Sequence, residues 1–209
     1  MIKHIIFDLD GTLIDSSPSV LAGFEHVFLM EGLEPLIPLK SSVIGPPLIQ
    51  TLRVLSGIED KKKLLQMARK FMEYYDFEAC LSSQPYKGVD VGLRKLVQDN
   101  FKLHIATNKR YIPAKNILKH LVWDSLFTSL YTLDKDGISF KSKSEMIKSQ
   151  LRKFDLSADQ TFYVGDRMED MEAALNNQLK FIGVSWGYGK FSEHVPTIDF
   201  FKQLENFVV

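Results

Sequence analysis

The chain has 209 residues, of which 45% are apolar and 25% charged, and its 26 basic and 26 acidic side chains give a formal net charge of zero. This composition is ordinary for a globular protein with one sizeable core, with or without an inserted module. A balanced charge provides no general attraction for nucleic acid or for an anionic membrane, so we expect neither as a partner. Any anion must therefore be held by a local site.

Cysteine content and hydropathy predict a cytoplasmic location. Cys80 is the only cysteine, which excludes an internal disulfide, and we expect it to be a buried apolar residue in a reducing compartment. The sequence shows no signal-peptide pattern and no apolar run long enough to cross a bilayer. We expect the protein to be a monomer or a homodimer.

The first expected element is a buried strand at residues 5–7, which runs directly into Asp8-Leu9-Asp10-Gly11-Thr12. A short apolar run before a turn is typical of a strand that is covered on both faces. Asp and Gly also favour ordinary turns. Two aspartates at the end of a buried strand are nevertheless costly, because like charges repel there and lose solvation.

The next stretch, residues 16–87, is expected to form a small all-helical module. One helix should begin near Ser16 and stop at Gly32, and two more should cover residues 48–55 and 61–81. No segment of this stretch has a convincing strand pattern.

From Gly88 onward, helix and strand patterns alternate. Helices are expected at residues 89–98, 111–121, 142–154 and 168–176, and strands at residues 101–107, 126–133, 160–164 and 180–184. This alternation predicts an α/β fold, a three-layer Rossmann-like parallel sheet with helices on both faces. Residues 1–15 and 88–209 would form the core, and residues 16–87 would be a helical insertion.

Ligands of open parallel sheets bind beyond the carboxyl ends of the strands. At that edge the sequence places Asp8 and Asp10, then Thr107-Asn108-Lys109, then Asp166 and Asp170. Several carboxylates in one site need a counter-charge. Hard oxygen ligands without a cysteine cluster indicate Mg²⁺.

A metal beside a nucleophilic carboxylate suits phosphoryl transfer. Asp8 can attack phosphorus and form an acyl phosphate, while Asp10 can protonate the leaving oxygen and later activate water. Thr107 and a lysine would neutralise charge on the other phosphoryl oxygens. Both Lys141 and Lys143 precede a predicted helix and are candidates for that lysine.

The ordered motifs resemble those of the haloacid dehalogenase (HAD) superfamily. The first is Asp8-Leu9-Asp10-Gly11-Thr12, the second is Thr107, the third is the lysine segment, and the fourth is Gly165-Asp166 with Asp170. The resemblance covers essentially the whole chain and is nearest to phosphoglycolate phosphatases, and it implies that the helical insertion is a small cap.

The resemblance also implies a role for each residue. Asp8 would be the nucleophile, and Asp10 would be the acid and base and would bind metal through its backbone carbonyl. Asp170 would support the metal directly or through water. The implied metal ligands are Asp8, Asp10, Asp166 and Asp170, and the implied substrate contacts are Thr107, Asn108 and Lys143.

The lysine segment departs from the family pattern. Many members have Lys followed by Pro, whereas this chain has Phe140-Lys141-Ser142-Lys143-Ser144-Glu145. We favour Lys143 because of its distance from the apolar helix positions Met146 and Ile147, and Lys141 stays an alternative.

Outside these motifs, the expectations are less specific. In the insertion, Lys40, Ser41 or Arg53 could contact substrate. His104, inside a strand, is expected to be structural, and so are Trp186 and Tyr188, which follow the last predicted strand.

The sequence therefore predicts a Mg²⁺-dependent phosphatase of a small phosphorylated metabolite, a phosphoglycolate-like phosphomonoester, that acts through an aspartyl phosphate. Pyrophosphate hydrolysis lies within the same chemistry. One alternative is a sugar phosphomutase of the same fold. Another is a catalytically weak scaffold that binds a partner protein.

Overall fold

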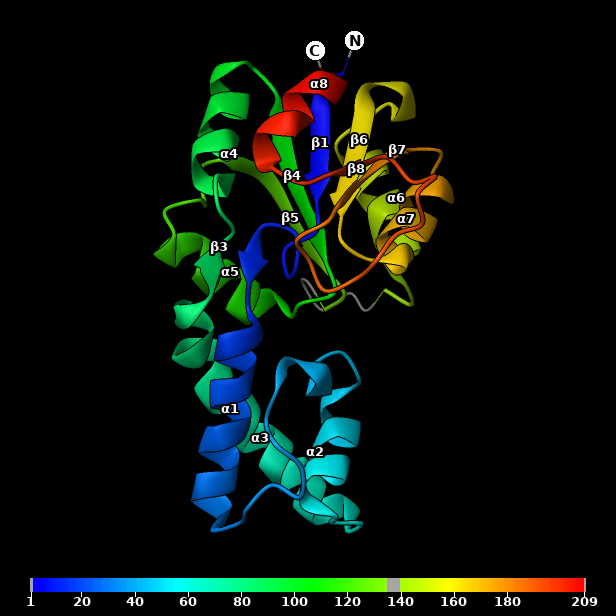
Figure 1. Ribbon diagram of the computed structural model, residues 1–209. Helices are drawn as coiled ribbons and strands as arrows, with labels where there is room; N and C mark the ends of the chain where they lie inside the picture. Colours follow the sequence, from blue (N-terminus) through cyan, green and yellow to red (C-terminus); the bar gives the residue numbers. More distant parts are fainter. Residues whose placement is uncertain (1, 135–139, 209) are drawn as a thin grey trace. The chain divides into compact units, whose positions relative to one another are not determined.

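The structure is a computed structural model that describes residues 2–134 and 140–208 (Figure 1). Residues 1, 135–139 and 209, which fall within the predicted core ranges, lie outside the described residues. The chain divides into two compact units: Met1–Asp15 with Gln84–Val209, and Ser16–Ser83. None of the helices in the described parts of the chain has the length and apolarity that a membrane span requires.

The first unit is built on a six-stranded parallel sheet with the strand order β5-β4-β1-β6-β7-β8. The strands are β1 (His4–Phe7), β4 (Lys102–Thr107), β5 (Phe127–Thr132), β6 (Thr161–Gly165), β7 (Lys180–Val184) and β8 (Thr197–Ile198). In the centre, Ile5 of β1 lies opposite Leu103 of β4 and Phe162 of β6. The predicted α/β fold with a parallel sheet and a helical insertion is confirmed.

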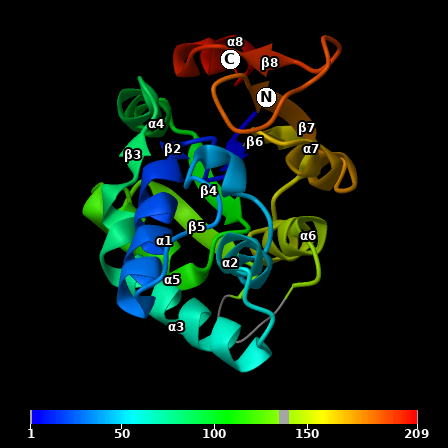
Figure 2. The same cartoon turned by 60° about the horizontal axis from the view of Figure 1, so that its bottom comes forward.

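Helices cover both faces of this sheet. They are α4 (Val89–Gln98), α5 (Tyr111–His120), α6 (Lys143–Lys153), α7 (Met168–Leu175) and α8 (Glu205–Val208), with short 3-10 helices η4 (Ala158–Gln160) and η5 (Phe201–Leu204). Figures 1 and 2 show α6 and α7 together on one side of the sheet and α4 on the other. The side chains of successive β1 residues pack on opposite faces of the sheet. Ile6 packs in the core cluster with Met146 and Ala173, and Phe7 stacks on Phe201.

The second unit consists of helices, as predicted. They are α1 (Ser17–Glu31), α2 (Leu48–Ser56) and α3 (Lys61–Phe77), with 3-10 helices η1 (Ser41–Val43) and η2 (Ala79–Ser82). The helix α1 ends at Gly32, whose φ of 63° is the left-handed conformation that glycine adopts readily. It packs on α3, where the ring of Phe24 lies 4.9 Å from that of Phe71. The predicted helix at residues 61–81 ends earlier, because its last turn is the separate η2.

The first unit also contains short strand pairings that the sequence pattern did not indicate. A two-stranded antiparallel sheet joins β2 (Ile14–Asp15) to β3 (Gln84–Pro85). The expectation that residues 16–87 contain no strand is therefore wrong at β3, and residues 84–87 group with the sheet unit. Strands of two residues are too short to produce an alternating pattern, and the same holds for β8.

A buried polar cluster lies between the sheet and α6. The Nδ1 atom of His104 on β4 lies 2.8 Å from Ser129 Oγ on β5, and its Nε2 atom lies 3.3 Å from Nδ1 of His4 on β1. Gln150 of α6 donates to the same Ser129 hydroxyl at 2.8 Å. Burial, together with the neighbouring His4, lowers the pKa of His104 to about 4.

We predict that His104 makes stability depend on pH between about 6.5 and 4. Because its folded pKa is below the ordinary 6.5, the unfolded chain binds a proton in this window that the folded chain does not. The contribution of His104 to the free energy of unfolding is complete above pH 6.5. It decreases by on the order of 3 kcal/mol as the pH falls toward 4. Chemical denaturation of wild type and His104→Gln across this range should show a steeper decline for wild type. Parallel declines would contradict the prediction.

Candidate active site

Asp8 is the first residue after β1, and it points to the face of the sheet that α6 and α7 cover. Its backbone N–H donates to Val164 O at 2.9 Å, which extends the pairing of β1 with β6. Its side chain is buried, and the ammonium of Lys143 donates to Asp8 Oδ1 at 2.9 Å and to Asp170 Oδ1 at 2.5 Å. One lysine therefore joins the end of β1 to the beginning of α7.

Asp166 lies in the turn between β6 and α7, Asp170 lies in the first turn of α7, and both are buried. Asp170 is the third residue of α7, and its Oδ2 atom accepts the backbone N–H groups of Asp166 at 3.1 Å and Arg167 at 3.0 Å. A carboxylate at this position satisfies amides that a helix leaves unpaired at its beginning. One oxygen of Asp170 thus fixes the turn and the other faces Lys143.

Asp166 is enclosed by two backbone turns that approach it closely. The backbone N–H of Tyr188 donates to Asp166 Oδ2 at 2.8 Å. A Cβ atom on Gly11, whose φ is +84°, would lie 2.4 Å from the same oxygen, and one on Gly187 would lie 2.3 Å from Asp166 Cβ. Only glycine fits at these two positions, so the turn after β1 and the loop after β7 are shaped around this carboxylate.

The loop after β7 also holds the beginning of the chain. Trp186 Nε1 donates to the carbonyl of Thr12 at 3.0 Å, and the hydroxyl of Tyr188 donates to Asp15 Oδ1 at 3.0 Å. These contacts tie the loop to the turn that carries Asp8 and Asp10.

The buried carboxylates are short of positive charge. Oxygen atoms of Asp8, Asp166 and Asp170 lie within 4.8 Å of one another. Burial raises the pKa of Asp8 to about 8, against the opposing effect of Lys143, and burial also raises the pKa of Asp166. Burial opposes the charged form of Lys143 as well, but the carboxylates, Asp8 foremost, hold its pKa well above the ordinary value.

A clustered set of anionic oxygen donors fits a hard divalent cation. Asp8, Asp166 and Asp170 could hold such an ion, because they are preorganised by the backbone and by Lys143. The predicted contribution of the Asp10 backbone carbonyl stays a prediction.

The side chain of Asp10 lies apart from the buried cluster and pairs with a second lysine. The Lys109 ammonium donates to Asp10 Oδ1 at 2.9 Å and to Oδ2 at 3.2 Å. The Asp10 side chain is 25% exposed, whereas that of Lys109 is 6% exposed. The sequence reasoning gave Lys109 no role, although its position two residues after β4 placed it at the same edge of the sheet.

The other predicted site residues lie at the ends of neighbouring elements. Thr107, the last residue of β4, is buried, and its Oγ1 atom accepts the backbone N–H of Lys109 at 3.2 Å. Asn108 is exposed and donates to Glu169 Oε1 on α7 at 3.0 Å. The contacts of Asn108 are thus with α7 and not with the carboxylate cluster.

The structure separates the two candidate lysines. Lys143 is the first residue of α6, because the Ser142 hydroxyl accepts the Glu145 N–H at 3.2 Å and caps the helix there. Its side chain points to Asp8, whereas Lys141, before the cap, is exposed.

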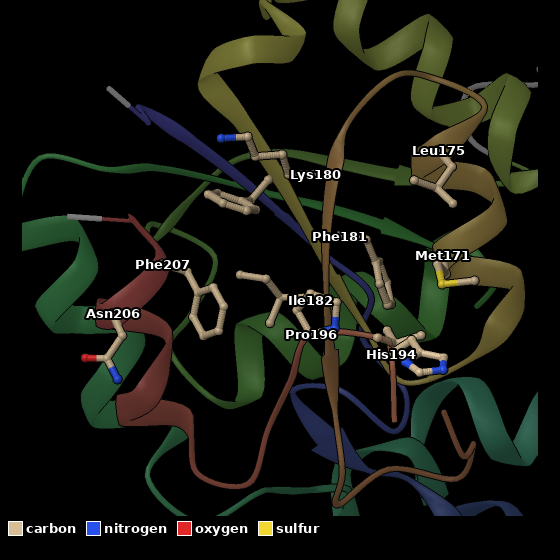
Figure 3. A pocket seen from close by; sticks show the side chains of 11 residues that line it. Met171, Leu175, Lys180, Phe181, Ile182, His194, Pro196, Asn206 and Phe207 are labelled. Atoms are coloured by element: carbon tan, nitrogen blue, oxygen red, sulfur yellow. The ribbon is translucent and has the colours of Figure 1, made fainter. Parts of the chain in front are cut away.

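A separate cavity of about 610 Å³ lies beside β7. Figure 3 shows Met171 and Leu175 of α7 on one side and Asn206 and Phe207 of α8 on the other. The cavity extends to Lys180 at the beginning of β7, whereas the carboxylates lie beyond the carboxyl ends of the strands. No predicted site residue is among the described residues that line it.

We predict that Lys143→Met destabilises the metal-free protein far more than Lys141→Met. The first change leaves Asp8 and Asp170 buried without their ammonium, and breaking such a pair costs about 3–5 kcal/mol. The second removes an exposed charge, and its effect should stay within about 0.5 kcal/mol. Denaturant unfolding in the presence of a chelator measures both. Equal losses would show that the buried contacts of Lys143 do not stabilise the fold.

Known proteins match this chain over nearly its whole length. A model of the family described as haloacid dehalogenase-like hydrolase matches residues 5–184. A 5'-nucleotidase from Pseudomonas aeruginosa is 30% identical over 198 residues, which cover 93% of this chain and 89% of that protein. A phosphoglycolate phosphatase from Neisseria gonorrhoeae is 30% identical over 196 residues, which cover 90% and 82%. The crystal structure of a candidate phosphatase from Clostridium difficile superposes with a TM-score of 0.86 at 25% identity, over 100% of this chain and 99% of that one.

Proposed function

We propose that this chain, which belongs to the haloacid dehalogenase-like hydrolase family and is a phosphatase of that family, hydrolyses a small phosphomonoester with Mg²⁺ and through a phosphorylated Asp8. The observation that carries the proposal is the buried cluster in which Asp8 lies against Lys143 and close to Asp166 and Asp170. The names of two relatives, a 5'-nucleotidase and a phosphoglycolate phosphatase, both denote enzymes that release phosphate. These names support a phosphomonoester as the substrate, and they do not identify the alcohol that is released from it.

The metal would be held by Asp8, Asp166 and Asp170, with the Asp10 carbonyl as the further ligand that the family resemblance implies. Mg²⁺ bound there supplies positive charge to the phosphoryl oxygens.

Asp8 would act as the nucleophile. Its Oδ1 atom accepts from Lys143 at 2.9 Å, which orients the carboxylate and leaves Oδ2 to attack phosphorus. A bond forms between Oδ2 and phosphorus while the bond from phosphorus to the leaving oxygen breaks. Lys143 remains beside the new acyl phosphate, where its charge neutralises a phosphoryl oxygen.

Asp10 would move the protons in both steps. In its protonated form it gives a proton to the leaving oxygen, and as a carboxylate it then takes a proton from the water that attacks phosphorus. This second attack releases inorganic phosphate and regenerates Asp8. The Thr107 hydroxyl, whose oxygen accepts from the Lys109 N–H, keeps its own proton free for a phosphoryl oxygen.

The helical unit is proposed to act as a cap that selects the leaving group, with Lys40, Ser41 or Arg53 as candidate contacts. This part of the proposal comes from the family resemblance, and the substrate named there, a phosphoglycolate-like monoester, is its most specific element.

We predict that wild type releases phosphate from members of a panel of phosphorylated metabolites in Mg²⁺ but not with chelator, and that Asp8→Asn releases none. Asp10→Asn should lose about 10²–10⁴-fold in turnover, the usual share of general acid–base catalysis. Colorimetric phosphate release measures all three proteins. Intact-mass analysis after rapid quenching should find a phosphoryl adduct on wild type and none on Asp8→Asn.

Several results would contradict this scheme. Turnover that survives in Asp8→Asn would exclude the covalent step. A stable, exchangeable phospho-enzyme that releases phosphate slowly and needs a bisphosphate would indicate a phosphomutase. No release and no adduct with any member of the panel would indicate a scaffold.

We also predict that Mg²⁺ stabilises the folded protein without substrate. At a concentration 100 times its dissociation constant, the ion should add about 2.7 kcal/mol to the free energy of unfolding. Asp166→Asn removes one buried anionic ligand and should lose most of this gain, while Asp159→Asn, at an exposed position of η4, should keep it. The thermal midpoint measured against Mg²⁺ concentration tests this, and equal shifts in the two variants would contradict the metal site.

A further inference from the structure

Asp10 is the site carboxylate with the fewest constraints of its own. Asp8, Asp166 and Asp170 are buried and joined through Lys143 and backbone amides. The Asp10 side chain is 25% exposed. Within residues 2–134 and 140–208, Lys109 is the one side chain that hydrogen-bonds the Asp10 carboxylate. Among the side chains of these residues, Lys109 is therefore the one that restrains the Asp10 carboxylate by hydrogen bonds.

Lys109 itself is well held. Its side chain is 6% exposed, so the methylene stem is packed and not free in solvent. Its backbone N–H donates to Thr107 Oγ1 at 3.2 Å. The intervening Asn108 is tied to Glu169 on α7 at 3.0 Å. The turn after β4 is thus fixed at both ends and presents one ammonium to the turn after β1.

We propose that Lys109 is a positioning residue for the acid and base Asp10: it fixes the carboxylate so that the proton passes to and from the reacting oxygen. The inference rests on the proposed function. An ammonium that contacts both oxygens of a carboxylate restrains both its χ1 and χ2 angles, and without it Asp10 samples several rotamers. A misplacement of about 1 Å can cost about 10²-fold in rate.

Lys109 is not proposed to bind the phosphoryl group, because its ammonium lies on Asp10 and the ammonium on Asp8 belongs to Lys143. The two roles differ in kinetics. Loss of a positioning contact lowers kcat and needs Asp10 for its effect, whereas loss of a phosphate contact raises KM and acts without Asp10.

The experiment compares wild type with Lys109→Met, Lys109→Arg and the control Lys115→Met, an exposed lysine on α5. The substrates are the best alkyl phosphate of the panel and p-nitrophenyl phosphate, each with saturating Mg²⁺. For the alkyl phosphate, Lys109→Met should lose about 10–100-fold in kcat with less than about threefold change in KM. Lys109→Arg should recover part of the loss, and Lys115→Met should match wild type.

A double-mutant cycle separates positioning from a merely structural effect. In the Asp10→Asn background, Lys109→Met should cause no further loss, because the group that it positions is already inactive. Thermal midpoints of all variants establish that each is folded, and Lys109→Gln replaces Lys109→Met if the latter unfolds.

The leaving group provides a second, independent readout. p-Nitrophenolate leaves without a proton, so rapid-quench formation of the phospho-enzyme from p-nitrophenyl phosphate should be nearly as fast in Lys109→Met as in wild type. Formation from the alkyl phosphate should slow by the full 10–100-fold.

Three outcomes would overturn the inference while leaving the proposed function intact: unchanged kcat in Lys109→Met, a loss confined to KM, or an equal further loss in the Asp10→Asn background. If wild type releases phosphate from no substrate, the proposed function fails and the inference fails with it.

Discussion

The site depends on one electrostatic constraint: three buried carboxylates lie close together, and one buried ammonium, that of Lys143, contacts two of them. A carboxylate loses solvation when it is buried, and neighbouring carboxylates repel, so Asp8 and Asp166 both have raised pKa values in spite of Lys143. This arrangement stabilises no fold by itself. It is tolerable because backbone amides at the start of α7 and after β7 donate to Asp170 and Asp166. A hard dication would supply the missing charge.

The two lysines of the site divide its chemistry. Lys143, at the first position of α6, contacts the buried Asp8, the proposed nucleophile, and Lys109, in the turn after β4, contacts the partly exposed Asp10, the proposed acid and base. In the proposed mechanism Asp8 must be ionised to attack phosphorus, whereas Asp10 must exchange protons with the leaving oxygen and with water. Separate ammonium groups would let Asp8 and Asp10, two residues apart in sequence, carry out these two different tasks.

Much of the fold and several residues of the candidate site could be predicted from the sequence, because the patterns that indicate them lie within short segments. The apolar run at residues 5–7 and the alternation after Gly88 predicted the parallel sheet, which is confirmed, and parallel strands bring their carboxyl ends to one edge. The contact of Lys109 with Asp10 spans 99 residues, and that of the Tyr188 amide with Asp166 spans 22. Such contacts depend on how turns from separate strands meet. No local pattern encodes that geometry, and β3 and β8 are too short to produce one.

In the proposed mechanism, the sheet unit would bind the phosphoryl group and transfer the proton, and it would not contact the alcohol. Asp8 and Thr107 are buried at the ends of β1 and β4, and Lys143 is buried at the beginning of α6, where they would face phosphorus and its oxygens. Asp10 lies at the partly exposed rim, where the leaving oxygen would emerge. A site divided in this way would perform the same hydrolysis on any monoester that reaches it. Relatives with similar sequences can therefore bear the names of enzymes for a nucleotide and for phosphoglycolate. Discrimination must come from groups that meet the alcohol beyond this rim, and the inserted helical unit is the part of the chain proposed to supply them.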